Sequence, residues 1–201
     1  MINRFKDYIR EKKLITTDDR VLAAVSGGID SMVMAHLLIE AGIKPGIAHC
    51  NFCLRDEESD GDEQFVRAFA GKNNLPFFTI RFDTTGYAAE NHISIQMAAR
   101  DLRYGWFEKI RKENGYTRIA VAHNLNDNIE TLILNLTRGT GLTGLSGIKP
   151  SSGHIIRPLL FATREEITSH SKERKIDFRE DRSNAQTKYI RNKIRHRIIP
   201  L

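Results

Sequence analysis

The sequence predicts an α/β protein in which a Rossmann-like parallel sheet of five strands carries helices on both faces. Short apolar runs rich in β-branched residues alternate with longer stretches of helical period, which is typical of a parallel sheet covered on both sides. The length of 201 residues is enough for one domain with a sizeable core. We therefore expect a single domain of this class, followed by a basic helical segment.

The expected strands and helices alternate along the chain. Apolar runs predict five strands, at residues 20–25, 45–50, 76–82, 118–122 and 154–158. Stretches of helical period predict four helices between them, at residues 29–41, 57–74, 93–114 and 127–138. The N-terminal stretch "MINRFKDYIREKKL" also has helical spacing and contains no apolar run long enough for a signal peptide.

Positive charge is concentrated near the end of the chain. The formal net charge is +6, and residues 162–201 hold eleven Lys or Arg against six Asp or Glu, which accounts for +5 of it. This distribution suits a polyanionic partner but does not require one. The sequence has no apolar run long enough to span a membrane and only two cysteines, so we expect a cytoplasmic protein.

Polar clusters follow three of the predicted strands. The residues after the first, second and fourth strands read "SGGIDS", "HCNFCLR" and "AHNLNDNIET". Ligands of such sheets bind beyond the carboxyl ends of the strands, where the strand order reverses. The sequence therefore predicts that the chemistry takes place at this edge of the sheet.

The stretch "AAVSGGIDSM" predicts a phosphate site. Gly27 and Gly28 permit backbone angles closed to other residues, and they lack side chains that would hold a ligand away. The amides of the turn and of the next helix can then converge on an anion. A plain strand-to-helix turn, with Ser26 or Ser31 as a cap, is the alternative. Two other phosphate motifs, GxxxxGKS/T and GxGxxG, do not occur.

This loop resembles the pyrophosphate-binding loop of the ATP pyrophosphatases, which split ATP into AMP and pyrophosphate while they activate a carbonyl oxygen. The resemblance implies a site for ATP and Mg²⁺, in which Asp30 lies near the metal and the loop amides contact the phosphates. The implied ATP-binding residues are Ser26, Gly27, Gly28, Ile29, Asp30 and Ser31.

Further motifs, from about residue 20 to the last residue, resemble the bacterial tRNA(Ile)-lysidine synthases in order and spacing. They read "HCNFCLRDEESDGDEQF", "AARDLRYGWF", "AHNLNDNIETLILNLTRGTGLTGLSG", "RPLL" followed by "TREEI", and "EDRSNAQTKYIRNKIRHRIIPL". The resemblance implies an adenine nucleotide alpha hydrolase-like fold and a ligase. Such enzymes adenylate the C2 oxygen of the first anticodon cytidine of a CAU-anticodon tRNA(Ile), and L-lysine then displaces AMP.

The same resemblance implies how the chain is organised. Residues 1–160 are expected to form the catalytic domain and residues 161–201 its basic helical extension. The family usually continues into further tRNA-binding domains, so we expect this chain to be a fragment. In the extension, Lys188, Arg191 and Arg195 recur at helical spacing beside an apolar stripe. We expect them to meet the tRNA backbone, with a solvated charged face as the alternative.

Asp127 and Glu130 lie three residues apart, so they project from one face of the predicted helix. As carboxylates they can bind Mg²⁺, which we expect at Asp30 and Asp127, or hold the ammonium group of the incoming lysine. A solvated acidic face is the other interpretation. His123 and Asn126 complete this predicted catalytic or lysine-binding group, although the family usually has Asp at the position of Asn126.

The resemblance also places a second group of residues near the nucleotide or the tRNA. These residues are His49, Asn51, Arg55, Arg100, Arg103, Arg138, Gly139 and Gly141. Surface charge is the alternative for each arginine, and an ordinary connection is the alternative for the loop at residues 138–147. Phe52 stands where the family has a second histidine, which weakens the prediction of a general base there.

Cys50 and Cys53 form a C-x-x-C pair, a pattern that binds zinc, carries redox chemistry or ligates an iron–sulfur cluster. We favour buried, chemically idle thiols because the chain has no third cysteine. A tRNA thiolase, in which cysteines carry the chemistry, is the main alternative function. An amidating synthetase or nucleotide-binding module that does not bind RNA is the second.

Overall fold

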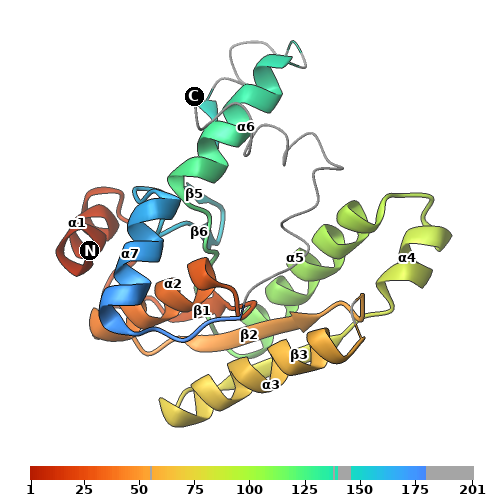
Figure 1. Ribbon diagram of the computed structural model, residues 1–201, viewed down its shortest axis with the longest axis horizontal. Coiled ribbons are helices and arrows are strands. Elements are labelled where there is room, and N and C mark those ends of the chain that lie inside the picture. Colours follow the sequence, from red (N-terminus) through yellow and green to blue (C-terminus); the bar gives the residue numbers. More distant parts are fainter. Residues whose placement is uncertain (55, 138, 140–145, 180–201) are drawn as a thin grey trace.

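The structure is a computed structural model that describes residues 1–54, 56–137, 139 and 146–179. In this part of the chain, six strands form one sheet in the order β3-β2-β1-β4-β6-β5 (Figure 1). All neighbouring strands are parallel except β5, which runs antiparallel to β6. The strands are β1 (Val21–Ala24), β2 (Gly46–Asn51), β3 (Phe77–Arg81), β4 (Arg118–Ala120), β5 (Ser151–Ser152) and β6 (Ile155–Ile156).

Helices cover both faces of the sheet. They are α1 (Ile2–Glu11), α2 (Ile29–Glu40), α3 (Asp56–Lys72), α4 (Thr84–Glu90), α5 (Ile95–Glu113), α6 (Leu125–Thr137) and α7 (Arg164–Arg174). Successive strand residues contribute to opposite cores: Ala23 packs with the α1, α2 and α7 layer, whereas Leu22 packs with Trp106 and Phe107 of α5. This alternation follows from the two-residue period of a strand. The predicted α/β class is therefore confirmed.

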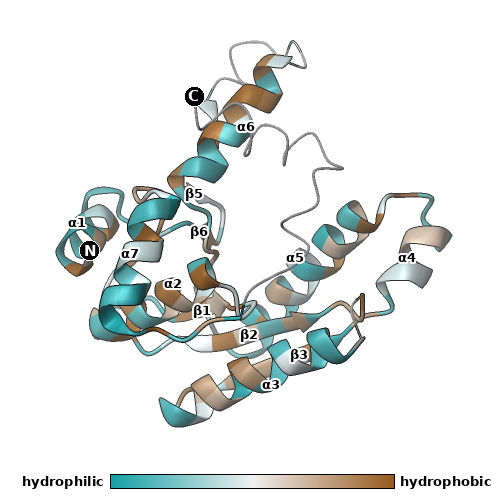
Figure 2. Cartoon of the chain, viewed as in Figure 1, coloured by the Kyte–Doolittle hydropathy of each residue, from teal (hydrophilic) through white to brown (hydrophobic). Residues whose placement is uncertain are grey.

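Helix α2 lies at the centre of the first core. Eight of its residues are buried, and most of the helix has the hydrophobic colour in Figure 2. Helices α1 and α7 both contact it, so α2 is enclosed from the sheet side and from the outer side. Ile167 of α7 and Ile176 after it belong to the same core, which fixes residues 162–176 to the body of the domain.

Two elements of the structure, β5 and α4, were not predicted from the sequence. The sheet has a sixth strand, β5, because two serines can complete a short antiparallel pair without an apolar run. Helix α4 has only seven residues, too few for a clear hydrophobic period. All five predicted parallel strands are present, and the four predicted helices begin and end within two residues of their expected bounds.

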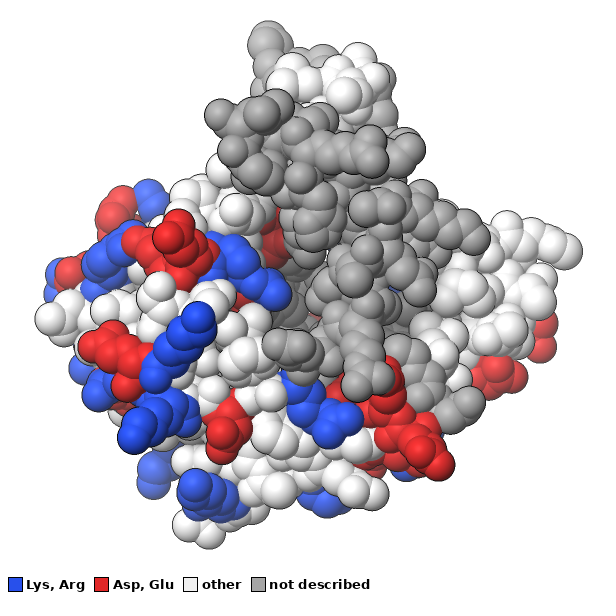
Figure 3. All heavy atoms as spheres, in the orientation of Figure 1, with Lys and Arg blue, Asp and Glu red and all other residues white. Residues whose placement is uncertain are grey.

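The strand order reverses between β1 and β4, which are neighbours in the sheet but far apart in sequence. This switch point is where ligands bind in open parallel sheets. The connection from β1 to α2 and the start of α6 both lie there. On the face shown in Figure 3, basic and acidic side chains are interspersed. Ion pairs in the described part of the chain include Arg174 with Glu40 and Arg179 with Asp62.

Candidate active site

The β1–α2 loop (residues 25–28) is held by its own serines. The hydroxyl of Ser31 accepts a hydrogen bond from the backbone N–H of Ser26 at 3.1 Å and donates to the carbonyl of Gly28 at 2.8 Å. The Ser26 hydroxyl lies 3.2 Å from the Ser31 hydroxyl and accepts from the Gly28 N–H at 3.4 Å. These contacts join residues no more than five positions apart, so the loop is built locally.

The two glycines of the loop are needed for different structural reasons. Gly27 has φ +94°, a conformation that side chains of L-residues rarely adopt. Gly28 has φ −73° and ψ 160°, angles that any residue can adopt, so only Gly27 uses the conformational freedom of glycine. A Cβ on Gly28 would meet only the Ser26 hydroxyl, at 3.5 Å. The missing side chain at Gly28 therefore leaves open space beside its N–H rather than relieving a strained backbone.

Asn124 joins the start of helix α2 to helix α6, and sequence reasoning did not single it out. Its side-chain amide donates to Asp30 Oδ1 at 3.3 Å. Its backbone N–H donates to Asp127 Oδ2 at 3.0 Å, and its Oδ1 accepts from the Asp127 N–H at 3.0 Å. The last two bonds form a reciprocal cap at the start of α6. The spacing Asn-x-x-Asp was the available sequence pattern for this cap.

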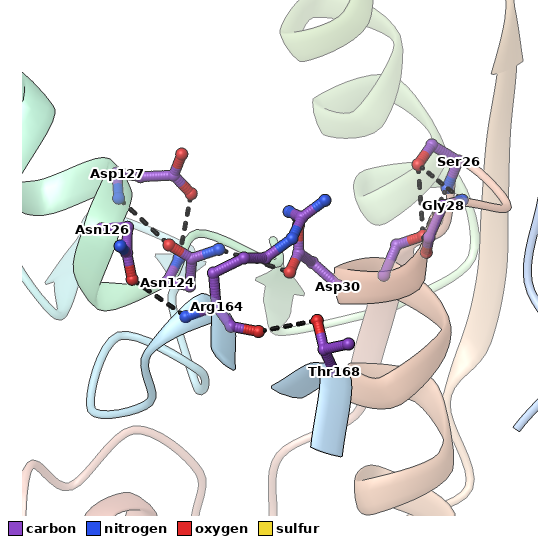
Figure 4. Close-up of polar contacts among 9 residues, drawn as sticks. Ser26, Gly28, Asp30, Asn124, Asn126, Asp127, Arg164 and Thr168 are labelled. Carbon is purple, nitrogen blue, oxygen red and sulfur yellow. Dashed lines mark hydrogen bonds and ion pairs between the residues drawn. The ribbon is translucent and has the colours of Figure 1, made fainter. Parts of the chain in front are cut away.

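Arg164, the first residue of α7, also lies against Asp30 (Figure 4). Its guanidinium forms an ion pair with Asp30 Oδ2. Its backbone N–H donates to the side-chain oxygen of Asn126 at 2.9 Å. Asn126 therefore fixes α7 against α6, and the oxygen with which it would ligate a metal accepts this bond. The motif "TREEI" contained Arg164, although no role was predicted for it.

Two carboxylates thus lie on either side of Asn124. Asp30 and Asp127 are both half-buried, and each accepts a hydrogen bond from Asn124. Magnesium is usually held by one or two carboxylates together with phosphates and waters, so the pair fits a magnesium ion that arrives with a nucleotide. Within the described ranges, no group of three or more His, Cys, Asp or Glu is arranged to hold a metal ion without such help. Glu130, one turn further along α6, is fully buried.

Two histidines at this edge carry their protons on different ring nitrogens. His49 Nδ1 lies 2.9 Å from the carbonyl of Val25, which can only accept, so Nδ1 carries the proton in the neutral ring. Burial lowers the pKa of His49 and favours that neutral form. His123 Nδ1 accepts from Arg157 Nε at 3.3 Å. Because arginine can only donate, the neutral His123 ring carries its proton on Nε2.

Arg157 is a further residue without a predicted role. It lies in the motif "RPLL", is 9% exposed, and donates from Nη1 to the carbonyl of Lys149 at 2.7 Å. Burial lowers its pKa, and Tyr104 and Arg100 of α5 are close enough to act on it electrostatically. Arg157 therefore links His123, through a hydrogen bond, to α5, through electrostatic interactions.

The predicted arginines of α5 contact aromatic rings. Arg100 lies over Tyr104, with 4.9 Å from guanidinium carbon to ring centroid, and Arg103 lies over Phe52 at 5.1 Å. Phe52 also stacks on Phe82, with centroids 5.8 Å apart. The residue that replaces the family's second histidine thus supports an arginine through a cation–π contact and has no proton to exchange.

Asn51 has a structural task. It is 2% exposed, its amide donates to Asp60 and Glu63 of α3, and its oxygen accepts from the Cys53 N–H. These bonds tie the end of β2 to α3. Burial raises the pKa of the Cys50 thiol to about 12, so this thiol stays protonated and unreactive near neutral pH.

The remaining predicted residues are Gly139 and six positions that the structure does not describe. Gly139 is described, with φ +64°. The other positions lie outside the described residues: Arg55, Arg138, Gly141, Lys188, Arg191 and Arg195. No helix in the described ranges has the length and hydropathy needed to cross a membrane.

A family model for the PP-loop domain matches residues 1–201, which is the whole chain. The chain belongs to the PP-loop family. This PP-loop domain is 50% identical over 194 residues to a tRNA(Ile)-lysidine synthase of Bacteroides thetaiotaomicron, covering 96% of this chain and 46% of the relative. It is 43% identical over 202 residues to a tRNA(Ile)-lysidine synthase of Chlorobaculum tepidum, covering 98% and 61%. It thus spans about half the length of the first curated relatives it matches.

Solved structures share the fold of this PP-loop domain. A U34-tRNA thiolase, NcsA from Methanococcus maripaludis with its 4Fe–4S cluster, superposes with a TM-score of 0.72 at 21% identity, covering 89% of this chain and 65% of that one. An NH3-dependent NAD synthetase from Campylobacter jejuni gives a TM-score of 0.62 at 16% identity, covering 87% and 72%. At these identities the likeness establishes the adenine nucleotide alpha hydrolase-like fold alone.

Proposed function

We propose that this PP-loop domain catalyses the synthesis of lysidine on a tRNA. In the proposed reaction, ATP adenylates the C2 oxygen of the wobble cytidine, position 34, of a CAU-anticodon tRNA(Ile). The ε-amine of L-lysine then displaces AMP and forms the carbon–nitrogen bond. The observation that carries the proposal is the identity of 45–50% to tRNA(Ile)-lysidine synthases over nearly the entire chain.

The β1–α2 loop is the proposed phosphate site. The Gly28 N–H, the open space beside Gly28 and the start of α2 favour an anion there. Asp30 and Asp127 would hold Mg²⁺, which offsets negative charge on the leaving pyrophosphate. His123, with its proton on Nε2, is a hydrogen-bond donor and not a base in this neutral form. We propose that it donates to an anionic group of the nucleotide.

Glu130 and Asp127 are the proposed partners of lysine. Glu130 is a fully buried carboxylate one turn after Asp127, and a buried carboxylate stabilises a cation more strongly than an exposed one does. Holding the ammonium group here would place the amine beside the activated cytidine. We further propose that residues 161–201 extend the domain, that Lys188, Arg191 and Arg195 contact the tRNA backbone, and that the reaction takes place in the cytoplasm.

The charge distribution supports the proposed contact between the end of the chain and the tRNA backbone. Residues 162–179 carry five basic and four acidic side chains, so four of the five excess positive charges belong to residues 180–201. Arg179, just before that segment, donates its backbone N–H to the carbonyl of Gly27 at 3.0 Å. The most basic part of the chain therefore begins at the proposed nucleotide site.

The test is an incubation with ATP, labelled L-lysine and a tRNA(Ile) transcript that has the CAU anticodon, followed by nucleoside analysis. We expect label in one modified cytidine, dependent on ATP. The matched control is the same transcript with uridine at the wobble position, which should stay unlabelled. An unlabelled CAU transcript, in the presence of a chain that binds ATP, would contradict the proposal.

A tRNA thiolase is the alternative that the fold of the structural neighbour favours. Two cysteines are fewer than an iron–sulfur cluster normally uses, and the half-buried Cys50 thiol has a raised pKa. Cys53 is exposed, so the prediction of buried thiols is wrong for that residue. The double variant Cys50→Ser with Cys53→Ser should therefore keep full activity. A folded but inactive double variant would favour the thiolase.

A further inference from the structure

Arg179 is fixed to the β1–α2 loop by its backbone and to α3 by its side chain. Its N–H donates to the Gly27 carbonyl at 3.0 Å. Its Nε donates to Asp62 Oδ1 at 2.6 Å. The guanidinium also lies close over the backbone of α3, because a Cβ on Gly61 would come within 2.8 Å of Arg179 Nη2. In Figure 1, the segment after α7 runs back toward the start of α2.

The bond to Gly27 determines the direction of an amide in the proposed phosphate site. In a trans peptide the carbonyl of one residue and the N–H of the next point in opposite directions. A partner that holds the Gly27 carbonyl therefore holds the Gly28 N–H pointing the other way. That N–H lies on the side of the Ser26 hydroxyl, which it meets at only 3.4 Å, near the long limit for a hydrogen bond.

The backbone of Gly27 can rotate more freely than that of a residue with a side chain. A glycine with φ +94° has no Cβ to restrict rotation of the following peptide. The contact of the Gly28 N–H with Ser26 is long, so it restrains this rotation weakly. The bond from Arg179, at normal length and anchored by the ion pair with Asp62, is the stronger restraint.

We propose that Arg179 is a positioning residue for the nucleotide loop: its backbone N–H orients the Gly27–Gly28 peptide so that the Gly28 N–H faces the phosphates. This inference rests on the proposed function in one respect only, that the loop binds ATP. Lysine and tRNA are not needed for it. A preorganised amide costs no reorganisation when the anion arrives, and this is the reason that such an orientation raises affinity.

The test measures the affinity for α,β-methylene-ATP with Mg²⁺ by calorimetry. Arg179→Pro removes the N–H and should weaken binding roughly tenfold, the equivalent of about 1.4 kcal/mol and of one lost hydrogen bond. Arg179→Ala keeps the N–H but loses the anchor, so it should weaken binding less. Asp62→Asn retains an acceptor for Arg179 Nε and should bind better than Asp62→Ala. The matched control is Arg174→Ala, which removes a similar ion pair, with Glu40, away from the loop.

The amide resonance of Gly28 provides a second readout that does not depend on activity. We expect it to shift in Arg179→Ala and Asp62→Ala, and to stay in place in Arg174→Ala, with thermal unfolding nearly unchanged in all three. If Arg179→Pro does not fold, these three variants decide the matter. Unchanged affinity and an unchanged Gly28 resonance in Arg179→Ala and Asp62→Ala would overturn the inference. A parent chain that does not bind the analogue would overturn the proposed function as well.

Discussion

The two halves of the candidate site are stabilised in different ways. The β1–α2 loop is held largely by hydrogen bonds among Ser26, Gly28 and Ser31, which lie within five residues of one another. The opposite half, at the starts of α6 and α7, depends on long-range contacts: Asn124 with Asp30, 94 residues apart, and Arg164 with Asp30, 134 residues apart. The first half therefore depends mainly on contacts within the loop, with the bond from Arg179 to Gly27 as a long-range restraint, whereas the second requires that three helices are docked.

This difference suggests that the two halves of the site bind different ligands. The local half offers amides to an anion and is suited to ATP, which is the same in every turnover. The long-range half presents carboxylates from α6 beside Arg164 of α7, and it is suited to the lysine and the metal. Changes in the first half should therefore affect nucleotide binding, and changes in the second should affect the steps that follow.

The largest effect is expected from Gly27→Ala. A non-glycine residue at φ +94° should destabilise the fold by about 1–3 kcal/mol and abolish measurable ATP binding, because the loop must distort. Calorimetry with ATP and thermal unfolding would measure both effects. Gly153→Ala is the matched control, since Gly153 also has positive φ but lies in the β5–β6 turn with open space around it. If both variants bind ATP equally, the local half is not the nucleotide site.

Glu130→Gln should separate the two halves most clearly. The amide keeps the shape of the buried side chain and removes the charge that would hold an ammonium group. We expect tRNA adenylation to continue and lysine incorporation to fall by an order of magnitude or more, since losing a charged partner costs about 1.5–3 kcal/mol. The two steps are measured by transfer of label from ATP and from lysine. Loss of both steps would assign Glu130 to the metal instead, and Glu113→Gln on the surface of α5 is the control.

Gly28→Ala should weaken ATP binding without destabilising the protein. Its backbone angles suit any residue and a Cβ meets only the Ser26 hydroxyl at 3.5 Å, so the unfolding temperature should not fall. A methyl group beside the amide should nevertheless hold the phosphates away, and we expect a loss of roughly tenfold in affinity. Normal affinity in this variant would mean that no phosphate approaches Gly28 closely.

A smaller effect is expected from Arg164→Ala. The guanidinium and Mg²⁺ both need Asp30, so removing Arg164 should lower the Mg²⁺ concentration that gives half-maximal pyrophosphate release. The pair is partly exposed, with 42% of the Arg164 side chain accessible, so the change should be at most about fivefold. Arg4→Ala, which breaks the contact with Glu166 of the same helix, should have no such effect. A raised Mg²⁺ requirement in Arg164→Ala would contradict this competition.

The same contrast explains what the sequence could predict. The position of the β1–α2 loop between a strand and a helix could be predicted because its pattern, an apolar strand followed by Ser-Gly-Gly and a helix, contains most of its own contacts. The sheet and its helices were predicted for a similar reason, since apolar periodicity is local. The positive φ belongs to Gly27 alone, and sequence patterns do not separate two adjacent glycines.

The tasks of Asn124, Arg157 and Arg164 could not be predicted in this way. Each is defined by a partner far along the chain: Asp30 for Asn124 and Arg164, and His123 for Arg157. The bonds of Asn51 to α3 are of the same kind, because their acceptors, Asp60 and Glu63, lie on another element. Only the packing of whole elements decides between these tasks.

The central claim is that the loop half activates the tRNA before the α6 half delivers lysine. The most direct test mixes the chain with α-³²P-labelled ATP, Mg²⁺ and the CAU-anticodon tRNA(Ile) transcript while lysine is left out. We predict that label accumulates on the wobble cytidine as bound AMP and that subsequent addition of L-lysine releases it as free AMP. Label that never appears on the tRNA without lysine, although the complete mixture forms lysidine, would contradict this account.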